Sequence, residues 1–116
     1  MWIAYARHPH GTIVVDDGAV RVLRDGGKSL LPAGVVSVQG RFRRGDAVSI
    51  SDLNGQEFAR GITAWSSKQV ERGRGKKSHE VRSLLGEGTP AEVVHRDDLM
   101  IINPRKSPEG RKGAEP

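Results

Sequence analysis

Glycine and proline interrupt this chain so often that long helices are not expected. The sequence has 15 glycines and 6 prolines among its 116 residues, and both residue types favour turns and end regular elements. Several of the runs between them alternate in polarity or are rich in β-branched residues, which is typical of strands. The length and this pattern predict one domain of short strands and short helices.

The clearest strand pair surrounds Asn54-Gly55. The preceding run, 47–52, alternates with Val48 and Ile50 on one face, which predicts a half-buried strand. Asn-Gly favours a type I′ hairpin turn because both central residues need positive φ. The return strand, 57–65, contains Gly61, where we expect a bulge. Further strands are expected at 12–15, 35–39, 91–96 and 99–102.

One main helix is expected after the first strand. Asp16 or Asp17 can cap its N-terminus, and Gly26-Gly27 can end it. Its apolar face is expected to hold Ala19, Val22 and Leu23.

Two shorter helices are expected later in the chain. Ser66 and Gln69 fit a capping box for the first, and Ser78 can cap the second. The second helix has the apolar stripe Val81, Leu84 and Leu85. The expected fold class is therefore mainly β with short helices (α+β), in the form of a small open β-barrel flanked by one main helix and one or two short ones.

Composition excludes several classes of protein. The chain has no cysteine, which rules out disulfides and thiolate sites and favours a cytoplasmic location. No apolar run approaches the length of a membrane span, so we expect no membrane partner.

The tripeptide Gly27-Lys28-Ser29 matches the end of a phosphate-binding loop, but its context does not. That loop requires a glycine five residues before its final glycine, and Val22 stands there. The expected helix also precedes the loop, whereas a phosphate loop leads into its helix. A nucleotide site is excluded on these grounds.

The titratable residues do not form a recognisable catalytic or metal-binding pattern. The four histidines lack a second ligand at a metal-binding spacing. The segment 95–98, His-Arg-Asp-Asp, lacks a serine or cysteine nucleophile elbow, and we expect a turn in which Asp97 or Asp98 accepts backbone hydrogen bonds. We predict no catalytic, cofactor-binding or metal-binding residue in this chain.

The chain is basic, with a net charge of +5 and a pI near 10.1. Six basic and two acidic residues lie between Lys68 and Arg82, and a second cluster holds Arg41, Arg43 and Arg44. Either group could contact phosphates or form a solvated surface. Trp65 is the one nearby aromatic residue, which favours backbone recognition over base stacking.

The series VVDDGAVRVL, LLPAGV, GDAVSI and GQEFARGI resembles the PUA family, named for pseudouridine synthases and archaeosine transglycosylases. The resemblance covers about 11–102 and implies a PUA-like open barrel. The residues that match its structural motifs are Asp17, Gly18, Ala19, Pro32, Gly34, Gly45, Asp46 and Gly61.

The stretches GKSLLPAGV, GRFRRGD, ARGITAWSS and EVVHRDDL resemble, more narrowly, the C-terminal PUA domain of bacterial glutamate 5-kinases. This implies a linker remnant at 1–10 from a missing kinase domain, a PUA domain at 11–102, and a disordered basic tail at 103–116. The implied parent phosphorylates L-glutamate with ATP and Mg²⁺ in the first step of proline synthesis. The chain itself would need no cofactor.

The resemblance leaves two functions open. One is a regulatory or assembly module whose partner is the amino-acid-kinase domain of the same parent chain, in which homo-oligomers can form. The other is binding of structured RNA through the first helix, the glycine-rich loop and the second strand. The candidate RNA-binding residues are Arg21, Arg24, Lys28 and Ser29, with Arg41 and Arg43 expected nearby.

Overall fold

A computed structural model describes residues 8–102 of the chain. The expected linker remnant at 1–10 therefore lies outside the described residues except for its last three, and the expected tail at 103–116 lies outside them entirely.

The described strands form a single mixed sheet that is open at both edges. Its five strands lie in the order β2-β1-β3-β4-β5, with β1 and β3 parallel and the other neighbours antiparallel. The strands are β1 (Gly11–Val15), β2 (Val35–Gly40), β3 (Ala47–Ser51), β4 (Glu57–Ile62) and β5 (Leu99–Ile101). Together with the helices, this sheet confirms the α+β prediction.

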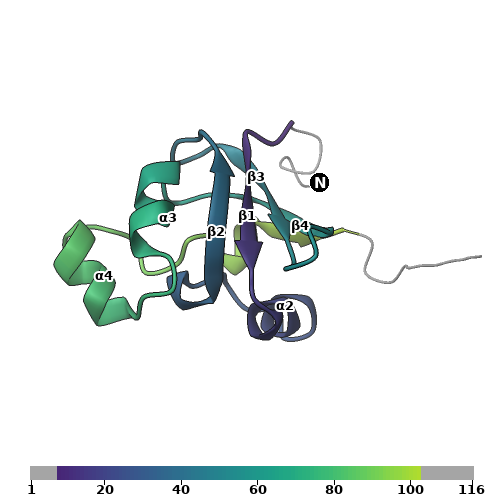
Figure 1. Cartoon of the computed structure of the whole chain (residues 1–116), viewed down its shortest axis with the longest axis horizontal. Coiled ribbons are helices and arrows are strands. Elements are labelled where there is room, and N and C mark those ends of the chain that lie inside the picture. The colour runs from purple at the N-terminus through teal and green to yellow at the C-terminus, as the bar shows by residue number, and fades with distance from the viewer. Residues whose placement is uncertain (1–7, 103–116) are drawn as a thin grey trace, which may run out of the picture.

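Three α-helices accompany the sheet in residues 8–102. They are α2 (Asp17–Arg24), α3 (Ser67–Gly73) and α4 (Ser78–Leu85), and two short 3-10 turns, η1 (Pro32–Gly34) and η2 (Arg96–Asp98), precede β2 and β5. Figure 1 shows α2 below the end of β1, while α3 and α4 lie beyond the edge strand β2. Helix α3 packs against β2, and both α3 and α4 contact η1.

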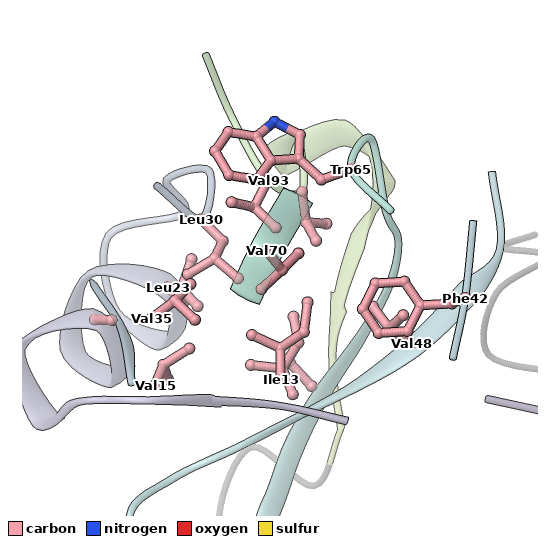
Figure 2. Packing of buried hydrophobic residues seen from close by; sticks show 14 of the residues in the cluster. Ile13, Val15, Leu23, Leu30, Val35, Phe42, Val48, Trp65, Val70 and Val93 are labelled. Carbon is pink, nitrogen blue, oxygen red and sulfur yellow. The ribbon is translucent and has the colours of Figure 1, made fainter. Parts of the chain in front are cut away.

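One apolar core joins the sheet to the helices. Ile13 and Val15 from β1 meet Leu23 from α2 and Val70 from α3, and all four are buried (Figure 2). Trp65 closes one end of this core, and its Nε1–H donates to Pro90 O at 2.8 Å. This bond satisfies the indole donor, which would otherwise be costly to bury.

Strand β3 is buried on both faces, so the prediction of a half-buried strand was wrong. It is the central strand, and even Ser49 and Ser51 on its polar face are buried. On that face, Glu57 binds Arg60 at 2.8 Å. Burial alone would raise the pKa of Glu57, yet hydrogen bonds from the side chains of Arg60 and Ser49 hold that pKa below its ordinary value.

The hairpin between β3 and β4 is confirmed, but its turn is not type I′. Gly55 N–H donates to Asp52 O at 3.0 Å, which places Leu53 and Asn54 at the centre of the turn. Gly55 follows with φ 82°. The Asp52 carboxylate accepts hydrogen bonds from the N–H groups of Asn54 and Gln56, and this favours the longer loop over the two-residue turn.

The expected strand at 91–96 is instead a single bridge between Val94 and Leu30. Both Val93 and Val94 are buried, so their β-branched side chains reflect burial in the core. Proline at 90 and the turn η2 bound this short segment, which leaves no room for a longer ladder. The return strand also ends early, at Ile62.

Gly61 does not lie at a bulge. The β3–β4 register shifts between Ile50 and Ser51, whereas Gly61 pairs regularly with Val48. A Cβ atom on Gly61 would lie 2.6 Å from Val94 Cγ1 and 3.0 Å from Asp98 O. The glycine is therefore needed because the Val94 and η2 segments pass directly over it.

The two short helices are present, with one difference at their ends. The capping box of Ser66 and Gln69 is confirmed. Lys77 is the N-cap of α4, and Ser78 is the first helical residue. The side chain of Glu80 supports this cap, since its Oε1 accepts the N–H of Lys77 at 2.8 Å. Of the expected apolar stripe, Val81 is buried but Leu84 is 41% exposed.

We predict that Gly61→Ala lowers the free energy of unfolding by about 1–3 kcal/mol, because the new methyl group would overpack against Val94 and a backbone carbonyl. Chemical denaturation measures the change. Gly88→Ala is the matched control, since nothing lies within 4 Å of its added Cβ. Equal stability of the two variants would show that the close packing over Gly61 is not rigid.

Candidate functional site at helix α2

Helix α2 is fixed at its start by Asp16. The Asp16 carboxylate accepts the N–H of Ala19 at 2.8 Å, and the Asp16 N–H donates to Gly34 O at 3.0 Å. The same residue thus caps the helix and joins it to η1. Gly27 follows the helix with φ 61°, which confirms that this pair of glycines lies where the helix ends.

A mainly apolar groove separates α2 from the segment 28–34. We call it the α2 groove. Its volume is about 510 Å³, and its lining includes Ala19, Val22, Lys28, Ser29, Leu31 and Ala33. Gly34 lies against Ala19, where an added Cβ would be 2.8 Å from that of Ala19. This approach brings η1 close to the helix at the base of the groove.

Val22 and Leu31 are the prominent apolar side chains of the α2 groove. They are 48% and 49% exposed, respectively. The expected apolar face of α2 included Val22, but only Ala19 and Leu23 are buried, because residues four apart on this short helix face the core. Val22 therefore lines the groove and is not part of the core. Its spacing in the sequence fits either position.

The loop after α2 is held by a distant part of the chain. Ser29 Oγ accepts the N–H of Arg96 at 2.8 Å, and Leu30 exchanges backbone hydrogen bonds with Val93 and Val94. The segments around Ser29 and around Arg96, 67 residues apart in sequence, thus lie side by side. The hydroxyl of Ser29 has a structural role here, in agreement with the exclusion of a nucleotide loop.

The turn at 95–98 is confirmed as η2. Its cap is the ring of His95, whose Nδ1 accepts the N–H of Asp97 at 3.1 Å. The expectation that Asp97 or Asp98 accepts backbone hydrogen bonds stays a prediction. Within residues 8–102, no three His or acidic side chains form a group that could hold a metal ion.

The candidate RNA-binding residues divide into two groups. Arg21, Arg24 and Lys28 are exposed around α2, and the guanidinium of Arg24 lies 5.4 Å from the centre of the Phe58 ring. Arg41 and Arg43 follow the other end of β2, since Gly40 pairs with Gly11 whereas Val35 pairs with Val15. The two ends of β1 are about 13 Å apart, so the expectation that these arginines are near α2 was wrong (Figure 1).

The basic segment between Lys68 and Arg82 makes one contact that the sequence did not indicate. Arg74 Nη1 donates to Val36 O at 3.0 Å, while Arg74 Nε pairs with Glu71. Arg74 therefore covers an open backbone carbonyl of the edge strand β2. Trp65 is fully buried and offers no surface for stacking against a base.

Comparison with known families decides what kind of domain this is. The model of the PUA domain family matches residues 11–85. The chain belongs to the PUA family. Among the residues expected to carry this resemblance, Asp17 and Ala19 lie in α2 and Pro32 and Gly34 form η1. Gly45 adopts φ 94°, and Asp46 accepts the N–H of Arg43.

Curated relatives of this PUA domain are named Glutamate 5-kinase. The chain is 52% identical over 103 residues to one from Gloeobacter violaceus and 47% identical over 102 residues to one from Dictyoglomus thermophilum. These matches cover 88% of the chain but 28% of each relative. The chain therefore spans just over a quarter of the length of the kinases it matches.

Solved structures share the PUA fold. A PUA domain from Aeropyrum pernix, solved as a tartrate complex, is 27% identical with a TM-score of 0.52, covering 75% of this chain and 43% of that one. A chain of the archaeal box H/ACA sRNP Nop10-Cbf5 complex is 22% identical with a TM-score of 0.53, covering 81% of this chain and 28% of that one. The second likeness concerns the fold alone.

We predict that Ser29→Ala destabilises the domain by about 1 kcal/mol, because the N–H of Arg96 loses its acceptor. Hydrogen exchange of the Arg96 amide should become faster, and denaturation measures the stability. Ser83→Ala on exposed α4 is the control and should change neither. Unaltered exchange at Arg96 in Ser29→Ala would contradict the structural role of this hydroxyl.

Proposed function

We propose that this chain is the non-catalytic PUA part of a glutamate 5-kinase and acts as a regulatory or assembly module. In this proposal the kinase domain lies in the same parent chain, in the cytoplasm. That domain would bind ATP and Mg²⁺ and phosphorylate L-glutamate, while the α2 groove contacts it. The observation that carries the proposal is the pair of half-exposed apolar side chains, Val22 and Leu31, in one groove.

The groove has the character of a protein-binding surface. Exposed apolar side chains gathered in a concave surface favour contact with another protein surface. The matched kinases extend well beyond this domain, since the chain covers 28% of their length. The remainder of the parent is therefore the partner most directly available. Contact there could couple the domain to inhibition by proline or to subunit assembly, as a free energy shared between two sites.

RNA binding is the second candidate, and the cations beside the groove favour it. Arg21, Arg24 and Lys28 are exposed around α2 and could bind phosphates. Two features make it the weaker candidate. The remaining arginines lie at the other end of the β1–β2 pair, and Trp65 is buried, so base stacking on this residue is excluded.

No helix in residues 8–102 has the length and apolar character needed to cross a membrane.

We predict that Val22→Asp combined with Leu31→Asp in the full-length kinase shifts the proline concentration for half inhibition by about fivefold or more, or alters oligomer size. A charged side chain in the groove would be desolvated on contact with the kinase domain. Inhibition curves, Mg²⁺ dependence and size-exclusion chromatography are the measurements. Leu53→Asp, at a leucine that is 53% exposed on the β3–β4 hairpin, is the matched control.

Deletion of the whole domain provides the stronger form of this test. If proline inhibition, Mg²⁺ dependence and oligomer size all stay the same after deletion, the regulatory proposal is wrong. If deletion changes them but the groove variant does not, the domain acts through a different surface.

For the RNA alternative, we predict that structured RNA binds the chain with an affinity that persists at physiological salt. The affinity should fall about tenfold or more in the double variant Arg21→Glu with Lys28→Glu, because two positive charges that contact phosphates become negative. Arg24 is left intact since it lies over Phe58. Arg72→Glu with Arg82→Glu, two exposed arginines on α3 and α4, is the control. Binding that vanishes at physiological salt, or that the two variants weaken equally, would identify non-specific attraction.

A further inference from the structure

A second hollow lies at the other end of the β1–β2 pair from the α2 groove. Its volume is about 270 Å³, and it is lined by His10, Arg41, Phe42, Arg43 and Asp46. We call it the arginine hollow. Its size is just below that of typical small-ligand pockets, which suits a small charged group better than a large apolar one.

Two glycines bring the walls of the arginine hollow together. A Cβ on Gly40 would lie 2.8 Å from His10 O, and one on Gly11 would lie 2.7 Å from the Phe42 ring. Gly40 also has φ 86°, a conformation that other residues adopt at a cost. The close approach of His10 to Arg41 is therefore built into the backbone by residues that have no side chain.

Phe42 and Asp46 fix the two arginines in place. Phe42 is buried, at 4% exposure, and anchors the chain between the exposed Arg41 and Arg43. Asp46 Oδ2 accepts the backbone N–H of Arg43 at 2.8 Å, and Asp46 N–H donates to Arg43 O at 3.0 Å. These bonds close a tight turn that fixes the backbone of Arg43, while the buried Phe42 anchors the backbone next to Arg41.

The guanidinium groups of the arginine hollow have no partner within the described part of the chain. Neither Arg41 nor Arg43 uses its side chain in an ion pair or hydrogen bond with another residue of 8–102. Asp46 supplies the one carboxylate among the lining residues, and one of its oxygens already accepts a backbone N–H. The net charge of the lining residues is therefore positive, and both arginines are exposed.

We propose that the arginine hollow binds a phosphate group. Two guanidinium groups offer forked pairs of N–H donors that match phosphate oxygens, and the imidazole of His10 can add a further donor. Phe42 also lines the hollow. This site is separate from the α2 groove, and it requires neither contact with a kinase domain nor the proposed regulatory role.

Titration of the 116-residue chain with inorganic phosphate at constant ionic strength tests the proposal. The expected result is saturable shifts in the amide NMR signals of His10 and residues 41–46. Arg41→Ala with Arg43→Ala should weaken binding by about tenfold or more, since each charged hydrogen bond contributes substantially. Arg41→Lys with Arg43→Lys should restore part of the affinity, because the charge returns without the fork.

Arg72→Ala with Arg82→Ala removes the same charge from α3 and α4 and should leave phosphate binding unchanged. Equal weakening by both double alanine variants, or equal shifts with chloride, would overturn the proposal. A dinucleoside monophosphate in place of inorganic phosphate distinguishes the source of the ligand: tighter binding of the diester indicates a nucleic-acid backbone, and tighter binding of inorganic phosphate indicates a small phosphorylated molecule. Val22→Asp with Leu31→Asp should not alter either result, so failure at this hollow and failure at the groove are separable.

Discussion

The short bridge between Leu30 and Val93–Val94 is the contact on which the rest of the domain depends. Leu30 N–H donates to Val94 O at 2.9 Å, and Val93 N–H donates to Leu30 O at 2.8 Å. Ala64 N–H also donates to Val93 O. Three segments that are distant in sequence thus meet at two valines, and all of Leu30, Val93 and Val94 are buried in the one core. Together with the bond from Arg96 N–H to Ser29 Oγ and the bond from Asp16 N–H to Gly34 O, this meeting point fixes the loop after α2 and hence the α2 groove.

Close backbone packing depends on where glycine occurs in this chain. Gly61 leaves room for the side chain of Val94, and Gly34 leaves room for the methyl group of Ala19. A Cβ added to Gly73 would lie 2.7 Å from the Trp65 ring. Each position brings a helix or turn nearer to a neighbour than a Cβ would permit. The core has few aromatic side chains to fill space, since aromatics make up 4% of the sequence, and close approach of the backbone compensates for their scarcity.

Local signals in the sequence predicted the elements well, because they depend on neighbours in the chain. The Asp16 cap, the capping box of Ser66 and the hairpin at Gly55 all act within a few residues. The errors arose where a distant contact decides the outcome. The β-branched pair Val93–Val94 is typical of a strand, yet within residues 8–102 it forms a single isolated β-bridge, between Val94 and Leu30. The role of Gly61 depends on a segment more than thirty residues away.

The candidate sites show the same division. The sequence indicated the basic residues and the family, but it led to the expectation that Arg41 and Arg43 lie near α2. That expectation was wrong because the sequence does not show which residues of β1 and β2 pair. The pairing of Gly11 with Gly40 and of Val15 with Val35 separates them and assigns an apolar groove to one end and a cationic hollow to the other. Binding at one end need not obstruct the other, so the domain could contact a protein through Val22 and Leu31 while Arg41 and Arg43 remain open to a phosphate. Charge reversal at Arg41 and Arg43 would therefore alter phosphate binding without weakening docking at α2, whereas one continuous binding face would lose both.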